Sequence, residues 1–276
     1  MRNNINLNTD YAFRKSFEGG IASNGFSSTK IRRVEDKAPF QEKVSNQVLA
    51  ALPSAELAKL LSLAKRIDFS AGESVFQPGD KIRYVYFPET AVFSEFDILQ
   101  DGKTCEIAMI GKEGFVGLPV ILDSATADRW TEVSLGGSAL RINSDIFQNS
   151  FTFGVPAQMK MNQYLNYYIK QISQRVVCNC YHQIKERFCC WLLMLQDRKE
   201  CSEFSLTQEQ IARLMGINRP SLSYIAKEIR DDNLINYSRG KITILDREKL
   251  ENSACSCYAE KMKEAFSNNG MEIQMI

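Results

Sequence analysis

The chain has 276 residues, a length that accommodates two modest domains and one connecting element. Hydrophobic residues make up 44% of the sequence and charged residues 24%, which is ordinary for a soluble globular protein. The formal net charge is only +1, which excludes a chain drawn onto nucleic acid by its overall field. Any attraction to DNA therefore has to be local.

The N-terminal part of the chain changes character near residue 40. Residues 1–40 are rich in Asn, Ser, Gly and basic residues without a sustained period, which predicts a flexible extension. From Phe40 to Leu63 the apolar residues follow helical spacing. Pro53 followed by Ser54 fits the start of a second helix in this stretch.

Between residues 66 and 142 the pattern changes to period two with glycine and proline punctuation, which predicts short strands. Seven strands are expected, at Arg66–Phe69, Ser74–Phe76, Tyr84–Pro88, Ala91–Ile98, Lys103–Ile110, Thr131–Ser134 and Ala139–Ile142. Asp101-Gly102 is a strong hairpin signal, because this pair suits turns that need positive φ. Short strands without intervening long helices predict a barrel-like antiparallel roll.

Residues 156–182 predict one long helix with a single apolar seam. The seam residues step by four, three, four and four positions: Met161, Leu165, Tyr168, Ile172 and Val176. The seam either packs on the helix's own domain or pairs with a second copy of the chain as a two-fold coiled coil. The strongly apolar stretch Ile184–Leu195 follows and predicts a core helix.

The stretch from 205 to 245 predicts two short helices joined by a tight turn and followed by a hairpin. Thr207, with a glutamine three residues later, can form a capping box at the first helix. Gly216 fits the sharp turn because glycine tolerates positive φ. Asn218 and Pro220 fit the start of the second helix. This order predicts a helix-turn-helix with a wing.

The exposed face of the second helix and the wing carry residue types that bind DNA. A helix can enter the major groove, where its N-terminal residues reach base edges and phosphates, and Arg219 can bind guanine through two hydrogen bonds. The expected DNA-binding residues are Thr207, Gln208, Asn218, Arg219, Ser221, Ser223, Tyr224, Lys227, Arg239 and Lys241. The alternative is a small helical bundle whose polar face is merely solvated.

The charge and symmetry of this segment bear on how it would bind. From residue 205 to residue 241, six basic residues stand against four acidic ones, a surplus that a dimer would double. Binding should therefore be salt-sensitive. Because one recognition helix alone reads too few bases for useful specificity, we favour the dimeric role for the seam of residues 156–182.

The sequence offers no convincing catalytic set, so we expect no enzyme. The single histidine, His182, has no second histidine with which to act. Asp101–Thr104 echoes the end of a phosphate loop, but the upstream glycine of that motif is missing. Of the eight cysteines, Cys178-x-Cys180 and Cys255-x-Cys257 could in principle hold zinc or an iron–sulfur cluster, but this spacing is weak evidence. We expect buried free thiols and no metal, with redox sensing as the alternative.

The helix-turn-helix resembles that of the cAMP receptor protein/fumarate–nitrate regulator (Crp/Fnr) family of bacterial transcription factors. The matching positions are Thr207, Glu209, Ile211, Ala212, Gly216, Arg219, Ser221, Ile225 and the run Asp231 to Ile235. The stretch from Gly72 to Asp80 resembles a signature of the family's cyclic-nucleotide-binding roll. The resemblance implies that Arg219 reads guanine. The family's founding member has glutamate and arginine where this chain has Pro220 and Tyr224, so its operator does not carry over.

The resemblance also places a candidate ligand site at Gly117, Leu118, Arg129 and Trp130. Nucleotide-binding members hold the ribose with a glutamate after the glycine, but Leu118 stands there and cannot accept a hydrogen bond. Arg129 matches the phosphate-binding arginine, but Trp130 replaces the Ser or Thr that follows it. Oxygen-sensing members carry an N-terminal cysteine cluster, and residues 1–104 contain no cysteine. We therefore expect neither a cyclic nucleotide nor an iron–sulfur cluster, and the effector is unknown.

These inferences combine into an α+β fold with five parts. They are a flexible extension (1–40), a cyclic-nucleotide-binding-like antiparallel β-roll sensor (41–155), a dimerisation helix (156–182), a winged helix-turn-helix (183–250) and a C-terminal tail helix (251–276). The predicted function is a homodimeric, sequence-specific regulator of transcription, with a palindromic double-stranded DNA operator and RNA polymerase as partners. The alternative is a cyclic-nucleotide- or redox-responsive signalling protein whose C-terminal module binds protein. With neither a secretory signal nor an apolar run of about 20 residues, a cytoplasmic location away from the membrane is expected.

Overall fold

The computed structural model describes residues 44–150 and 154–259, so the predicted extension over 1–40 lies outside the described residues. The described chain opens with two short helices, α2 (Gln47–Ala50) and α3 (Ser54–Leu63), the second beginning where Pro53-Ser54 predicts it. Asn46 caps α2, because its side chain accepts a hydrogen bond from the Leu49 amide. The Asn46 amide also donates to the carbonyls of Pro88 and Gly114, which ties α2 to the roll.

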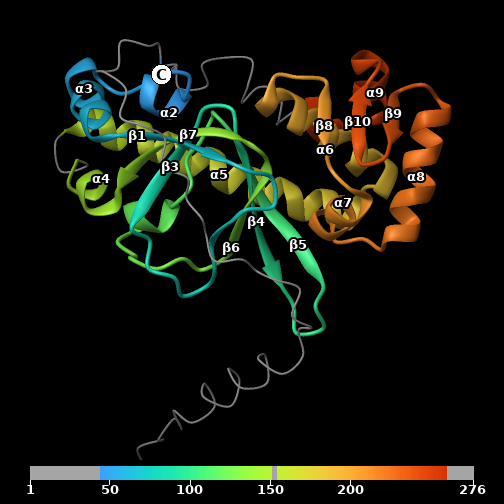
Figure 1. The fold of residues 1–276 in the computed structure, drawn as a ribbon, viewed down its shortest axis with the longest axis horizontal. Helices are drawn as coiled ribbons and strands as arrows, with labels where there is room; N and C mark the ends of the chain where they lie inside the picture. The colour runs from blue at the N-terminus through green and yellow to red at the C-terminus, as the bar shows by residue number, and fades with distance from the viewer. Residues whose placement is uncertain (1–43, 151–153, 260–276) are drawn as a thin grey trace, which may run out of the picture. The chain divides into compact units, whose positions relative to one another are not determined.

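The roll consists of two antiparallel sheets (Figure 1). The three-stranded sheet has the order β1-β7-β3, formed by Lys65–Phe69, Gly137–Asn143 and Tyr84–Pro88. The four-stranded sheet has the order β2-β6-β4-β5, formed by Ser74–Phe76, Trp130–Leu135, Val92–Ile98 and Thr104–Ile110. All seven predicted strands are confirmed, with ends that differ from the prediction by at most two residues.

The predicted turns of the roll are present as well. The β4–β5 hairpin turns at Asp101-Gly102, where Gly102 has φ +80°. Gly117 has φ +106° and precedes the 3-10 helix η1 (Leu118–Leu122). The interior between the sheets is filled by aromatic rings, among them Phe87, Phe93 and Phe115, which are fully buried. The roll therefore has its own apolar core.

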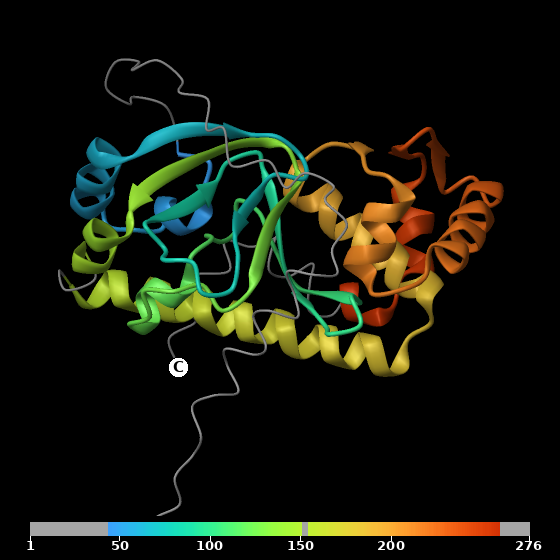
Figure 2. The ribbon, with the colours of Figure 1, turned by 60° about the horizontal axis from the view of Figure 1, so that its bottom comes forward.

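The long helix α5 (Val155–Tyr181) follows the short α4 (Ser144–Ser150) and confirms the predicted helix (Figure 2). It runs beneath the roll and on toward the C-terminal elements. Its buried face recurs at helical spacing: Ala157, Met161, Tyr164, Tyr168, Gln171, Gln174 and Cys178. Met161 and Tyr168 pack into the core of the roll, so assigning them to a dimer seam was wrong. Two of the predicted seam residues belong to the face that the helix keeps for its own chain.

The next helix, α6 (Ile184–Lys199), is the apolar centre of the C-terminal half. Its residues from Phe188 to Leu195 are all buried, as the apolar stretch predicts. Several polar contacts join it to the roll, among them two that are buried. The Trp191 indole donates to Glu106 at 2.9 Å, and the fully buried Arg198 guanidinium donates to Glu113 at 2.8 Å.

The C-terminal elements form a winged helix-turn-helix. In chain order they are β8 (Glu203–Ser205), α7 (Gln208–Met215), α8 (Arg219–Asp231), β9 (Ile235–Ser238), β10 (Lys241–Ile244) and α9 (Arg247–Ser253). The three strands pair in the order β8-β10-β9. In the described part of the tail helix expected over 251–276, α9 begins earlier and ends at Ser253, Ala254 is extended, and residues 256–259 are helical again. Residues 260–276 lie outside the described chain.

Candidate nucleic-acid interface

The ends of α7 and α8 are fixed by the caps that the sequence predicts. The Thr207 hydroxyl accepts from the Gln210 amide, and the Gln210 side chain accepts from the Thr207 amide, which completes the capping box. Gly216 has φ +66° and ends α7. The Asn218 side chain then accepts from the Ser221 amide at 2.8 Å and starts α8. These local bonds set the turn between the two helices.

Helix α8 has one buried face and one exposed face. The buried face consists of Leu222, Ile225, Ala226 and Ile229. On the opposite side Tyr224 is 72% exposed, and Arg219 and Lys227 are also exposed. Arg219 is the first residue of the helix, beside the partially positive N-terminus. The face can therefore be reached from outside the chain.

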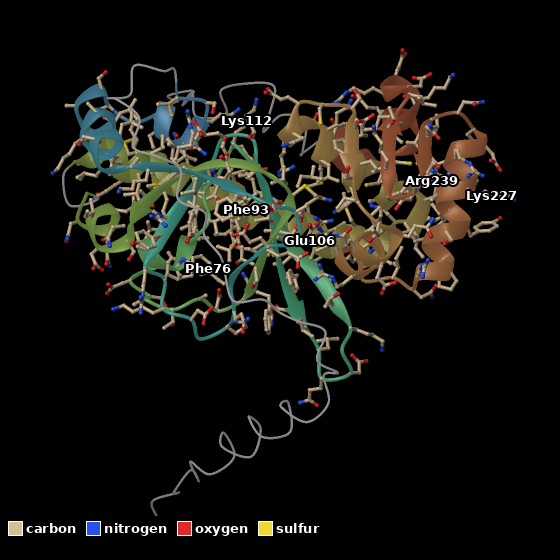
Figure 3. All side chains as sticks on the ribbon, in the orientation of Figure 1. Phe76, Phe93, Glu106, Lys112, Lys227 and Arg239 are labelled. Carbon is tan, nitrogen blue, oxygen red and sulfur yellow. The ribbon has the colours of Figure 1, made fainter. Side chains whose placement is uncertain are left out.

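Three cations on this surface are available to a ligand. Among the described residues, Arg219, Lys227 and Arg239 have no ion-pair partner. Figure 3 shows Lys227 projecting from α8 and Arg239 at the neighbouring wing. Lys241 differs, because its ammonium group pairs with Glu203 at 2.6 Å. Its charge is partly offset within the chain, so we expect it to contribute less to anion binding than the other three.

The wing is a two-residue hairpin. Ser238 pairs with Lys241, which leaves Arg239 and Gly240 as the loop. Both loop residues have positive φ, +50° and +77°, the conformation of a type I′ turn. This turn holds the Arg239 side chain at the tip of the hairpin, as the sequence predicts.

Two of the expected DNA-binding residues also bond to each other within the protein. The Ser223 hydroxyl donates to the Gln208 side-chain oxygen at 2.6 Å, which links α8 to α7. The sequence analysis did not foresee this bond, because it joins positions fifteen residues apart on different helices.

The charge of Arg219 also acts on Tyr237 at the base of the wing. The Tyr237 hydroxyl donates to the Leu206 carbonyl at 2.9 Å. Burial raises the pKa of Tyr237 to about 12, and the positive charge of Arg219 acts in the opposite direction. Helix α8 also contacts β9, so this helix and the wing contribute to one surface.

The first helix of the motif packs on the roll through the β4–β5 hairpin. The Thr104 hydroxyl donates to the Arg213 carbonyl at 2.6 Å. The Arg213 guanidinium forms an ion pair with Glu132 of β6 and lies 5.0 Å from the centre of the Phe96 ring. A Cβ on Gly216 would lie 3.1 Å from the Thr104 carbonyl oxygen, so the approach is close. The roll and α7 are therefore in direct contact.

The candidate ligand residues of the roll are engaged by the protein itself. Arg129 lies 3.8 Å from Asp97 and donates to the Tyr168 hydroxyl at 3.4 Å. Tyr168 in turn donates to the buried Glu95, whose pKa is raised by burial. A phosphate would meet these carboxyl groups beside Arg129. Leu118 is buried and Trp130 packs against the core of the C-terminal half, so neither supplies a hydrogen-bonding group to a ribose.

A cluster that the sequence analysis set aside lies at the end of α5. Cys178, His182, Cys255 and Cys257 place their ligand atoms within 4.8 Å of one another. One signal in the sequence could have indicated it, because Cys178 and His182 are four residues apart and share a face of a helix. Cys180, the other half of the first Cys-x-Cys pair, is exposed and is not part of the cluster.

The comparisons with known proteins agree with this geometry. Residues 186–253 match the family model described as the Crp-like helix-turn-helix domain. The comparison with curated protein sequences gave no match. Among the described residues, no helix is both long and apolar enough to cross a bilayer.

Several solved structures share the fold. FixK2 from Bradyrhizobium japonicum is 14% identical, with a TM-score of 0.59 over 70% of this chain and 98% of its own. TTHB099, a CRP-family transcriptional regulator from Thermus thermophilus, is 17% identical, with a TM-score of 0.58 over 69% and 96%. The c-di-GMP-responsive regulator CLP from Xanthomonas campestris is 16% identical, with a TM-score of 0.58 over 70% and 100%.

The fold and the motif together define a class: this is a β-roll joined by a long helix to a winged helix-turn-helix. The chain carries a Crp-like helix-turn-helix domain within the fold of the Crp/Fnr transcriptional regulators.

Proposed function

We propose that the protein is a homodimeric, sequence-specific DNA-binding regulator of transcription. The observation that carries the proposal is Arg219, an exposed arginine without an ion-pair partner among the described residues, at the first position of α8. A guanidinium there can reach the O6 and N7 atoms of a guanine when α8 lies in the major groove. Lys227 and Arg239 then neutralise phosphates on either side. We propose no catalytic role for the chain.

The proposed dimer interface is the outer face of α5. Beside the buried Met161 and Tyr168, a row of apolar residues follows Leu165, Ile169, Ile172 and Val176. Ile169 is 54% and Val176 is 58% exposed, and Leu165 and Ile172 are partly buried against the roll. Their spacing alternates between four and three residues, which is the a/d pattern of a two-stranded coiled coil. Exposed β-branched residues on this pattern favour pairing with a second copy of the helix.

A two-fold dimer presents two copies of α8 to one duplex. Recognition helices about 34 Å apart read half-sites one helical turn apart, so the operator should be a palindrome. The state of the roll would set the relative orientation of the two copies through α5 and the contact between Thr104 and Arg213. To shift the equilibrium between the two arrangements, an effector must bind one of them more tightly than the other. Because Arg129 already faces Asp97 and Glu95, we do not propose a cyclic nucleotide as that effector.

Fluorescence anisotropy with a labelled random-sequence duplex tests DNA binding. We expect measurable affinity at about 50 mM salt that falls steeply by about 200 mM, because phosphate contacts release counterions. Lys227→Glu should weaken binding strongly. Lys249→Glu, an exposed lysine on α9 that pairs with Asp246, is the matched control and should change binding little. Absence of affinity at low salt, or equal effects of the two variants, would favour a module that contacts protein.

A further inference from the structure

Four side chains with metal-binding atoms converge where α5 ends. The Cys178 and Cys255 sulfurs are 3.9 Å apart, and the Cys257 sulfur is 3.6 Å from His182 Nδ1. A tetrahedral zinc ion places two thiolate sulfurs about 3.8 Å apart and a sulfur and an imidazole nitrogen about 3.5 Å apart. Both distances fit a shared ion at the centre of the four groups.

The ligands come from two elements that are fixed on either side of the cluster. Cys178 lies in the last turn of α5 and His182 is its C-terminal cap, so both project from one face of the helix. Cys255 and Cys257 follow α9, which is held by the buried Leu250. An ion pair between Arg247, the first residue of α9, and Asp197 of α6, at 2.7 Å, holds α9 against α6. Folding therefore brings together two pairs of ligands that are far apart in the sequence.

The surroundings suit a metal–thiolate centre. All three cysteines are buried and His182 is half-buried, so the centre would be shielded with one edge toward solvent. The Gln174 amide donates to the Cys257 sulfur at 2.7 Å and also approaches Cys178, which is the kind of outer bond that orients metal ligands. Three thiolates and one divalent ion leave one negative charge.

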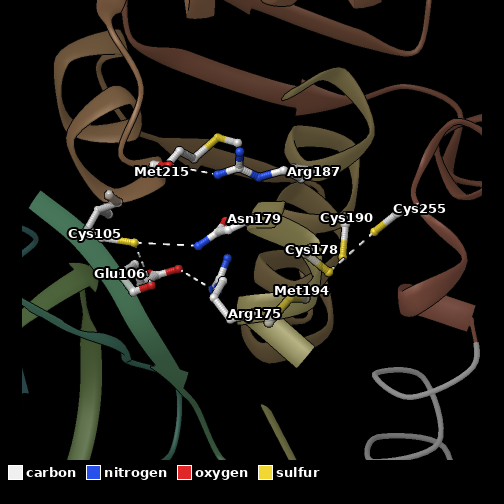
Figure 4. A pocket seen from close by; sticks show the side chains of 11 residues that line it. Cys105, Glu106, Arg175, Cys178, Asn179, Arg187, Cys190, Met194, Met215 and Cys255 are labelled. Carbon is white, nitrogen blue, oxygen red and sulfur yellow. Dashed lines mark hydrogen bonds and ion pairs between the residues drawn. The ribbon is translucent and has the colours of Figure 1, made fainter. Parts of the chain in front are cut away.

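A pocket beside the cluster contains two guanidinium groups. Cys178 and Cys255 line it together with Arg175 and Arg187 (Figure 4). Arg187 donates to the Met215 carbonyl and Arg175 to Glu106, so both guanidinium groups are held in place. The buried Glu106 offsets the charge of Arg175, so among the described residues that line this pocket Arg187 is the guanidinium without an ion pair.

We propose that Cys178, His182, Cys255 and Cys257 form a structural site for one Zn²⁺ ion. Four protein ligands of the Cys₃His type leave no open position, which is the pattern of a structural rather than a catalytic zinc site. On binding, the three thiols release their protons to solvent and the neutral imidazole coordinates through Nδ1. Four donor atoms within 4.8 Å suit a single ion better than a cluster, in which the thiolates ligate different irons.

The ion would fasten the junction between the two halves of the chain. Gln183, the residue after His182, is extended and separates α5 from α6. A metal bound to both the end of α5 and the segment after α9 would restrict bending at this residue. The site is independent of DNA binding, so its test needs no DNA.

The test uses the full chain, purified under reducing conditions, stripped with a chelator and titrated with Co²⁺ and then with Zn²⁺. We expect about one Co²⁺ per chain with the visible bands of tetrahedral cobalt and the near-ultraviolet band of thiolate ligation, both abolished by Zn²⁺. Cys257→Ser and His182→Ala should each weaken Co²⁺ binding at least tenfold. Cys180→Ser is the matched control, because Cys180 is exposed two residues from Cys178, and it should titrate like the unaltered chain.

A thermal-unfolding series keeps the result interpretable if a variant folds poorly. Zn²⁺ should raise the Tm of the stripped unaltered chain and of Cys180→Ser, because it binds only the folded site, but should leave the Tm of Cys257→Ser unchanged. The proposal is overturned if the unaltered chain takes up no tetrahedral cobalt, or if Cys180→Ser loses binding as Cys257→Ser does. It is also overturned if the protein is isolated with stoichiometric iron and sulfide, which would identify a cluster.

Discussion

The proposed recognition of a base depends on the Arg219 guanidinium, which is exposed at the first position of α8. In the proposed complex, replacing Arg219 with alanine removes two hydrogen bonds to one base while leaving the cap at Asn218 intact. We expect Arg219→Ala to cost about 1–3 kcal/mol on the preferred duplex and to relax preference at a single base position. Competition binding with duplexes that differ at each position in turn measures both effects.

Lys227→Ala provides the comparison, since a contact to phosphate carries no base information. It should weaken binding to all sequences alike and reduce the salt slope by about one. If Arg219→Ala instead lowered the affinity for every duplex equally, Arg219 would be a phosphate contact and its role as a base reader would be refuted.

Glu95 makes a pH dependence of stability testable at one residue. Burial raises the pKa of this carboxyl group in the folded state, so folding disfavours its ionised form. The unfolded chain ionises near its ordinary pKa, and stability attributable to Glu95 is therefore present at low pH and is lost as the pH rises through the folded pKa. Glu95→Gln removes this pH-dependent loss of stability, because glutamine has no carboxyl group to ionise. The unfolding free energy of Glu95→Gln relative to the unaltered chain should increase as the pH rises above the ordinary pKa of a glutamate, and a difference that stays constant with pH would contradict the assignment.

At the scale of elements, caps and turns could be predicted from the sequence because each is a local arrangement. Thr207, Asn218 and the Asp101-Gly102 turn act through bonds within three residues of themselves. The face of α5 could not be predicted in the same way. Its apolar residues surround more than half of the helix, so the spacing alone does not show which of them pack on the roll. Only the position of the roll shows that Met161 is buried in its core while Ile169 is exposed.

The outer face of α5 yields a prediction for assembly. Ile169→Glu places a charge in the proposed seam, where burial against a second copy would leave it unpaired, and we expect the chain to sediment as a monomer with weakened DNA binding. Leu122→Glu is the control, because Leu122 on η1 is 55% exposed, close to the 54% of Ile169, and is not part of α5. A monomeric unaltered chain, or a dimer that survives Ile169→Glu, would contradict the proposed interface.

At the scale of the whole molecule, the halves of the chain are joined by buried polar pairs that a sequence does not reveal. Arg198 of α6 and Glu113 after β5 have side chains 0% and 4% exposed and meet at 2.8 Å. Arg198→Met would leave the Glu113 carboxylate buried without its counter-charge, which should cost about 3–5 kcal/mol in denaturant unfolding. The exposed pair Arg230–Asp231 should cost under about 1 kcal/mol when Arg230 is replaced by alanine. Similar costs for the two variants would show that the buried pair does not hold the halves together.

The cysteine–histidine cluster belongs to this scale too. Its two pairs of ligands are separated by the entire winged helix-turn-helix, so spacing along the chain gives no sign that they meet. The sequence shows Cys255-x-Cys257 only as a weak motif. Packing of α9 on α6 is what turns it into half of a tetrahedral set.

Selection of bound duplexes from a random pool tests the regulator proposal most directly. The full chain should enrich a palindrome whose half-site centres lie about one helical turn apart, because two copies of α8 related by a two-fold axis read the same bases on opposite strands. A guanine enriched in each half-site by the unaltered chain, but not by Arg219→Ala, would identify Arg219 as the residue that reads it. A pool that remains random after repeated rounds at low salt would contradict it.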